Sequence, residues 1–77
     1  KFPAYRKYSN SRSIFKITSF ERFQEIKRTG SKSELFYFEA KIHPDRMLIN
    51  DMLDMKDGHW IESSVEEFDE ERRKTQA

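Results

Sequence analysis

The chain of 77 residues contains no cysteine, only two glycines and two prolines, and no long apolar run. Without cysteine it can form neither a disulfide nor a thiolate zinc site, and a reducing compartment is permitted. Two glycines are too few for a glycine-rich phosphate-binding loop. No apolar stretch approaches the roughly 18 residues of a membrane span, and the first residues hold no apolar signal-peptide core. We therefore expect a cytoplasmic protein with no membrane partner.

Charge is abundant but nearly balanced. Charged residues make up 38% of the chain, and the formal net charge is +1. Nine Lys/Arg against two Glu give residues 1–33 a charge of +7, and six Lys/Arg against twelve Asp/Glu give residues 34–77 a charge of −6. Such a division either presents a basic surface to a polyanion or sets two complementary halves against each other. The second interpretation is the simpler one for a small domain.

The clearest pattern in the chain lies at residues 35–42, Leu-Phe-Tyr-Phe-Glu-Ala-Lys-Ile. Phe36, Phe38, Ala40 and Ile42 alternate with Tyr37, Glu39 and Lys41, which is typical of a strand with one buried and one wet face. We expect the face that carries the Phe side chains to form the core. The wet face suits an antiparallel or mixed sheet.

Before this strand the sequence predicts a β-hairpin and then a helix. The hairpin joins residues 4–8 to residues 12–17 through the turn cluster Ser-Asn-Ser. In residues 18–29 the apolar side chains recur every three positions and alternate with polar ones, which favours an amphipathic helix. Thr18 and Glu21 have the spacing of a capping box at its start, and Gly30 is placed to end it.

After the strand the sequence predicts a helix, a short strand and a last helix. Pro44 closes the strand, and the apolar residues that follow mark a helix over 45–56. Residues 59–62 form a short β-prone stretch, and either Ser63 or Ser64 can cap the helix after it. We expect one domain over residues 1–77, with residues 73–77 frayed.

The expected fold class is therefore α+β, with a three- or four-stranded antiparallel or mixed sheet and the helices packed on one face. The element order is β-hairpin, α, β, α, β, α. The expected core is Phe15, Ile17, Phe20, Phe23, Ile26, Phe36, Phe38, Ala40, Ile42, Leu48, Ile49, Met52, Leu53, Trp60 and Phe68.

Catalytic and metal chemistry find little support in the sequence. His43 and His59 flank the helix expected over 45–56, whose two ends are about 16 Å apart by helical rise, so one ion could hardly reach both. The acidic residues between them are the ordinary composition of a solvated helix face. None of the Ser or Thr residues lies in a glycine-flanked nucleophile elbow. We expect no enzyme activity, no catalytic residues, no cofactor and no metal.

Two binding functions remain. The first is a non-catalytic binding or regulatory module that contacts a protein partner or a second copy of itself, by elimination of the other classes. The second is single-stranded nucleic-acid binding by the N-terminal hairpin, where rings that can stack on bases stand beside cations. The near-neutral charge of the whole chain speaks against the second. The residues expected to contact a partner or a nucleic acid are Tyr5, Arg6, Lys7, Tyr8, Arg12, Lys16 and Tyr37.

Overall fold

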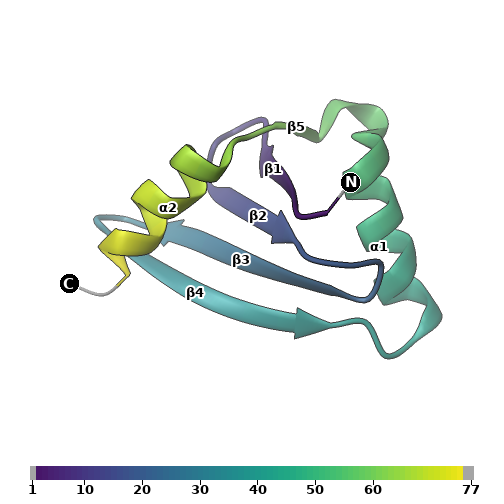
Figure 1. Ribbon diagram of the computed structural model, residues 1–77. Coiled ribbons are helices and arrows are strands. Elements are labelled where there is room, and N and C mark those ends of the chain that lie inside the picture. The colour runs from purple at the N-terminus through teal and green to yellow at the C-terminus, as the bar shows by residue number, and fades with distance from the viewer. Residues whose placement is uncertain (1, 76–77) are drawn as a thin grey trace.

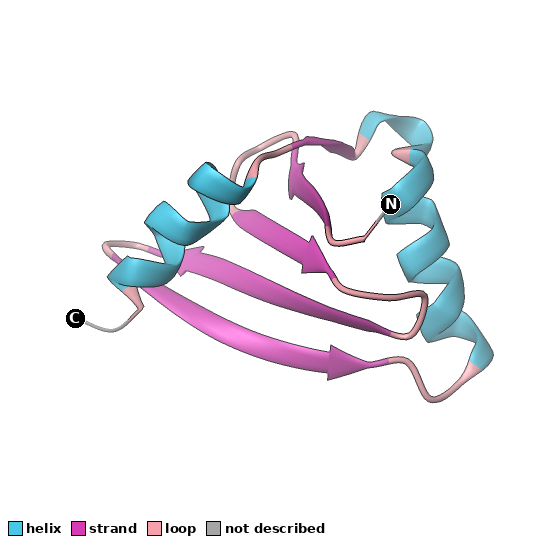
Figure 2. Ribbon diagram, in the orientation of Figure 1, coloured by secondary structure: helices cyan, strands magenta, loops and turns pink. Residues whose placement is uncertain are grey.

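The computed structural model describes residues 2–75, which form a five-stranded antiparallel sheet and two α-helices (Figures 1 and 2). The strand order across the sheet is β4-β3-β2-β1-β5. The two helices lie at opposite ends of the sheet (Figure 1). The elements in chain order are β1 (Ala4–Tyr8), β2 (Ser13–Ile17), β3 (Arg22–Thr29), β4 (Lys32–Glu39), α1 (His43–Asp54), a 3₁₀ turn η1 (Lys56–Gly58), β5 (Trp60–Glu62) and α2 (Val65–Lys74).

The α+β class is confirmed, but the expected strand number and element order are wrong in detail. Residues 18–29 do not form a helix, because residues 22–29 form β3. Phe23 is buried on one face of the sheet and Ile26 on the other, each against a different cluster. A strand buried on both faces can place apolar residues three apart, which a helix also does. Phe20 lies in the loop before the strand and is 61% exposed.

Gly30, expected to end a helix, instead forms a hairpin turn. Thr29 pairs with Lys32 across a two-residue loop, and Gly30 has a φ of +63°. Two-residue hairpin loops require such a positive φ, which glycine adopts without steric cost. The Thr18 and Glu21 side chains accordingly make no capping box. The Thr18 hydroxyl donates to the Arg22 carbonyl, and the Glu21 amide donates to the Ser19 hydroxyl.

The helices pack on opposite faces of the sheet, so the expectation of a single covered face is also wrong. Ile49 and Met52 of α1 pack in one buried cluster with Phe15. Phe68 of α2 packs in a second cluster with Ile14. Ile14 and Phe15 are neighbours in β2, and neighbouring strand residues point to opposite faces. We call these the α1 face and the α2 face.

Each helix covers only part of its face, and this leaves several expected core residues in solvent. Phe36 is 38% exposed and Phe38 is 45% exposed, although both lie on the α1 face. Of the other expected core residues, Ile42 and Leu48 are exposed and Leu53 is half-buried. Ile14, which was not expected in the core, is fully buried. The remaining expected core residues are buried: Phe15, Ile17, Phe23, Ile26, Ala40, Ile49, Met52, Trp60 and Phe68.

The C-terminal half follows the sequence pattern more closely. Helix α1 starts two residues before the expected start, with Pro44 in its first turn, and ends at a left-handed Met55. Ser64 caps α2, accepting from the Glu67 amide at 3.1 Å. Helix α2 continues through Lys74, and residues 76–77 of the segment expected to fray lie outside the described residues.

Candidate functional site

The residues expected in the N-terminal site do not share one surface. Strand β1 lies inside the sheet, between β2 and β5. Its neighbouring residues alternate between faces, so Arg6 and Tyr8 lie on the α1 face while Tyr5 and Lys7 lie on the α2 face. The hairpin thus divides its rings and its cations between two sides of the molecule.

The four side chains of β1 also make internal contacts. The Arg6 guanidinium donates to the carbonyls of Met52 (3.1 Å) and Leu53 (3.2 Å) in the last turn of α1. On the other face the Lys7 ammonium pairs with the Glu67 carboxylate of α2 at 2.6 Å. These two cations therefore attach the helices to β1.

The two tyrosines of β1 pack against rings. The Tyr5 ring centroid lies 5.9 Å from that of Phe68, and burial, with the nearby carboxylates of α2, raises the pKa of the Tyr5 hydroxyl. The Tyr8 ring packs edge-on against Phe15, with ring centroids 5.3 Å apart, and stacks on Trp60, with ring centroids 5.9 Å apart. Both rings are half-buried packing residues, and neither is free to stack fully on a base.

The structure does bring Lys16 and Tyr37 onto one surface. Lys16 pairs in register with Gln24, and Gln24 pairs with Tyr37, so the three form a row across β2, β3 and β4 on the α2 face. Tyr37 is 69% exposed. Arg12 is exposed in the turn between β1 and β2, away from this row.

The basic and acidic halves of the sequence contact each other. Besides the pair between Lys7 and Glu67, Arg28 of β3 binds the buried Glu71 of α2 at 2.5 Å. Arg22 and Glu39 also lie 3.6 Å apart. These ion pairs join residues 1–33 to residues 34–77, as the simpler interpretation of the charge division expects.

The sequence pattern did not indicate that β4 lies at a free edge of the sheet. Eight residues long, β4 pairs with β3 on one side and has no strand on the other among the described residues. The opposite edge is β5, which has only three residues. A long strand with an unpaired side is a template for pairing with another chain, and natural proteins usually protect such edges. The alternation at 35–42 predicts a strand but contains no information about its neighbours.

The hydrogen-bond ladder shows which residues of β4 face outward. The Ala40 amide donates to the Glu21 carbonyl at 2.6 Å. Every second residue counted back from Ala40, including Phe38 and Phe36, therefore directs its backbone N–H and C=O toward β3. The backbone groups of the intervening residues then point away from the sheet. These outward residues are Ser33, Leu35, Tyr37 and Glu39.

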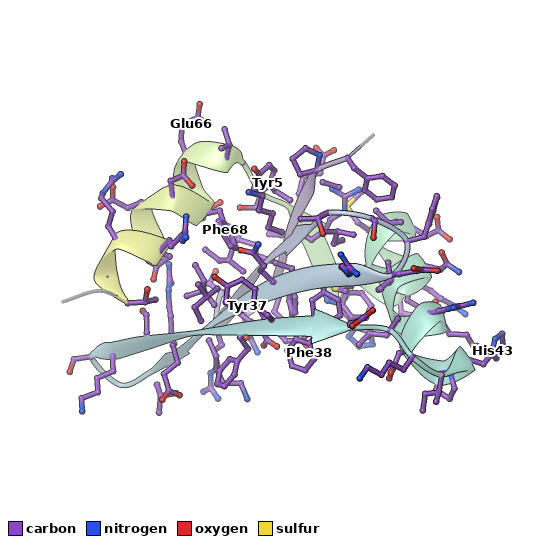
Figure 3. The ribbon with its side chains drawn as sticks, turned by 60° about the horizontal axis from the view of Figure 1, so that its bottom comes forward. Tyr5, Tyr37, Phe38, His43, Glu66 and Phe68 are labelled. Carbon is purple, nitrogen blue, oxygen red and sulfur yellow. The ribbon has the colours of Figure 1, made fainter. Side chains whose placement is uncertain are left out.

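Exposed rings flank this edge on both faces. Phe36 and Phe38 are partly exposed on the α1 face, and Tyr37 is exposed on the α2 face. Figure 3 shows Tyr37 and Phe38 extending from neighbouring positions of β4. A hollow of about 170 Å³ lies beside Phe38, lined by Tyr8, Phe15, Phe23, Glu25, Phe38, Glu39, Ala40, Asp45 and Leu48. We call it the aromatic pocket.

Other kinds of site are not evident in the part of the chain that the structure describes. No three His, Asp or Glu side chains of residues 2–75 gather into a set that could hold a metal ion. No helix among those residues is long and apolar enough to cross a membrane. No protein-family model, curated protein or solved structure matches the chain.

Proposed function

We propose that this chain is a non-catalytic binding module that pairs the edge of β4 with an extended segment of a partner protein. The observation that carries the proposal is the combination of a long strand whose outer edge has no strand beside it among the described residues and three exposed rings on its two faces. In strand addition, backbone hydrogen bonds supply affinity, and the side chains on alternate positions supply specificity.

The aromatic side chains give the edge its binding energy. Phe36, Tyr37 and Phe38 are between about a third and two thirds exposed, and aromatic residues dominate interface energetics because each buries a large area. A strand placed next to β4 would contact Phe36 and Phe38 on one face and Tyr37 on the other. The surface thus offers apolar contact on both sides of the backbone ladder.

Nucleic-acid binding has weaker support. Of the residues proposed for it, only Lys16 and Tyr37 share a row on one face, and Lys16 is half-buried, while Arg6 and Lys7 bind the helices. We therefore propose the protein partner as the first function and treat binding to single-stranded DNA as an outcome of its test.

The test is a selection of peptides from a random display library against the folded protein, followed by amide hydrogen exchange. Bound peptides should slow the exchange of the Leu35 and Tyr37 amides, which point outward. Tyr37→Pro should abolish this binding and leave the protein folded, because proline is tolerated where the N–H of an edge strand faces solvent. Tyr37→Ala is the matched control, since it removes the ring but keeps the amide, and it should only weaken binding.

Two results would overturn the proposal. One is a set of peptides that bind Tyr37→Pro as well as the original protein, which would place binding elsewhere. The other is the absence of peptide binding together with salt-dependent binding of labelled single-stranded DNA, because a fall in affinity with salt marks phosphate contacts.

A further inference from the structure

We propose that the aromatic pocket binds the cationic end of a Lys or Arg side chain, which the partner strand presents beside Phe38. The delivery of that side chain rests on the proposed function, whereas the chemistry of the pocket can be tested by itself.

The pocket has a buried aromatic floor and an open aromatic rim. Phe15 and Phe23 are buried and form its floor, while Phe38 is 45% exposed at the rim. The Phe23 and Phe38 rings stack with centroids 4.9 Å apart. A volume of about 170 Å³ accommodates one small organic group, since a cavity of roughly 150 Å³ holds a benzene ring. Aromatic faces of this kind attract cations through their quadrupoles.

Two half-buried carboxylates of the lining have no basic partner among the described residues. Glu25 accepts a hydrogen bond from the Ser13 hydroxyl at 2.8 Å, which leaves much of its capacity unused. Asp45 stands in the first turn of α1, and the one hydrogen bond that its carboxylate accepts from residues 2–75 comes from the Lys41 amide at 3.4 Å. Burial and the negative charge of Glu25 raise the pKa of the Tyr8 hydroxyl, so the Glu25 carboxylate lies close enough to Tyr8 to affect it electrostatically.

The lining contains no Lys or Arg to neutralise these carboxylates. Glu39, the third acidic residue of the lining, already pairs with Arg22. The nearest basic residue on the same strand and face, Lys27, lines a different hollow near the turn between β1 and β2. A half-buried carboxylate beside aromatic rings is stabilised most by a cation on an apolar stem, because the stem packs on the rings while the charge meets the carboxylate. The side chains of Lys and Arg have this form.

The pocket is placed so that a strand added to β4 could fill it. Phe38 and the pocket lie on the α1 face, and the partner residue directly opposite Phe38 would project its side chain to the same face. A long basic side chain at that position passes over the Phe38 ring toward Glu25. The proposed partner is thus an extended peptide with a Lys or Arg at the position that opposes Phe38.

The experiment uses small probes and NMR spectroscopy on the full chain. Butylguanidinium, butylammonium and neutral butanol are titrated separately while the ring signals of Tyr8 and Phe38 are followed. We expect the cations to bind about tenfold more tightly than butanol, from the sum of cation–π and charge-assisted contacts. Glu25→Gln should weaken cation binding about tenfold and leave butanol binding unchanged, because only the charge is removed.

Glu34→Gln is the matched control, because Glu34 is an exposed carboxylate of β4 on the same face but outside the pocket. It should leave the binding of all three probes unchanged. Equal affinity for butanol and the cations, or equal effects of the two Glu→Gln changes, would overturn the inference. If the cations fail to bind while peptides still protect the Tyr37 amide, the pocket inference fails and the proposed function stands. If the cations bind but no peptide protects the amides of β4, the pocket inference stands and the proposed function fails.

Discussion

The ion pair between Arg28 and Glu71 should show a strong asymmetry when either partner is removed. The Glu71 side chain is 4% exposed, and it accepts hydrogen bonds from Arg28 at 2.5 Å, Lys74 at 3.2 Å and Ser33 at 3.2 Å. The Arg28 side chain is 38% exposed. Removing Arg28 leaves a carboxylate in the interior with weaker partners, whereas removing Glu71 leaves a guanidinium that is partly in water and still donates to the Ser11 carbonyl at 3.1 Å.

The magnitudes follow from this difference in burial. Breaking a buried pair by removing one partner costs about 3–5 kcal/mol. Since Lys74 still contacts Glu71, we expect Arg28→Met to cost about 3 kcal/mol, at the lower end. Glu71→Leu removes the buried charge itself and leaves the unpaired charge on the partly exposed Arg28, so it should cost less, about 1 kcal/mol. A domain of this length has a total free energy of unfolding of roughly 4–11 kcal/mol, so the difference is measurable.

The assay is urea denaturation at neutral pH, followed by the fluorescence of the buried Trp60. Burial alone would raise the pKa of Glu71, but its hydrogen bonds and attraction to Arg28 and Lys74 outweigh this and lower it. A lowered folded-state pKa gives stability that is present above the ordinary carboxyl pKa and is lost as pH falls through the folded value. The deficit of Arg28→Met should therefore shrink in acid. Equal losses for the two variants at neutral pH, or a deficit that grows in acid, would refute the reasoning.

Two further predictions concern the fold. Ile26→Ala should cost about 2–5 kcal/mol because Ile26 is fully buried. Phe20→Ala should cost less than about 1 kcal/mol because Phe20 lies exposed in a loop. Comparable losses of the two variants in urea denaturation would favour a helix over this segment. Arg6→Ala should cost about 1–2 kcal/mol, since two carbonyls at the end of α1 lose a charged donor. Lys7→Ala is the comparison, because the partly exposed ion pair of Lys7 is worth less than about 1 kcal/mol. If Arg6→Ala lowered the free energy of unfolding no more than Lys7→Ala does, the role of Arg6 at α1 would be contradicted.

The sequence predicts those elements whose pattern has one physical explanation. Alternation identifies the strand at Leu35, and Pro44 marks the following helix start, because few other structures accommodate these features. The segment at Phe23 and Ile26 has two explanations, a helix with one apolar face or a strand buried on both sides. Only the positions of α1 and α2 on opposite faces decide between them, and those positions depend on contacts far along the chain.

The candidate site was harder to predict, because strand order is not encoded in local pattern. Two rings and two cations stand together at Tyr5, Arg6, Lys7 and Tyr8, which predicts one binding surface. In an internal strand neighbouring residues point to opposite faces, so these four divide between the two sides of the sheet, where they contact helices and neighbouring strands. Tyr37 is predicted to be exposed because it lies on the wet face of its strand. Of the three tyrosines in the expected site, it is the one whose ring is largely in solvent.

The position of β4 at the edge also explains why the alternation at Phe36 and Phe38 predicted burial that the structure lacks. Two rings on one face of a strand require a cover, and α1 provides it fully only for Ala40 and the strands farther into the sheet. An edge strand has a neighbour on one side only, so its side chains lose half of the lateral contacts that an internal strand supplies. The same rings that the pattern assigns to a core are therefore left partly in solvent, where Phe36 pairs in register with Glu25 and Phe38 lines the same pocket as Glu25. A second strand would complete the cover that the pattern at 35–42 predicts, which is why we propose that a partner strand binds there.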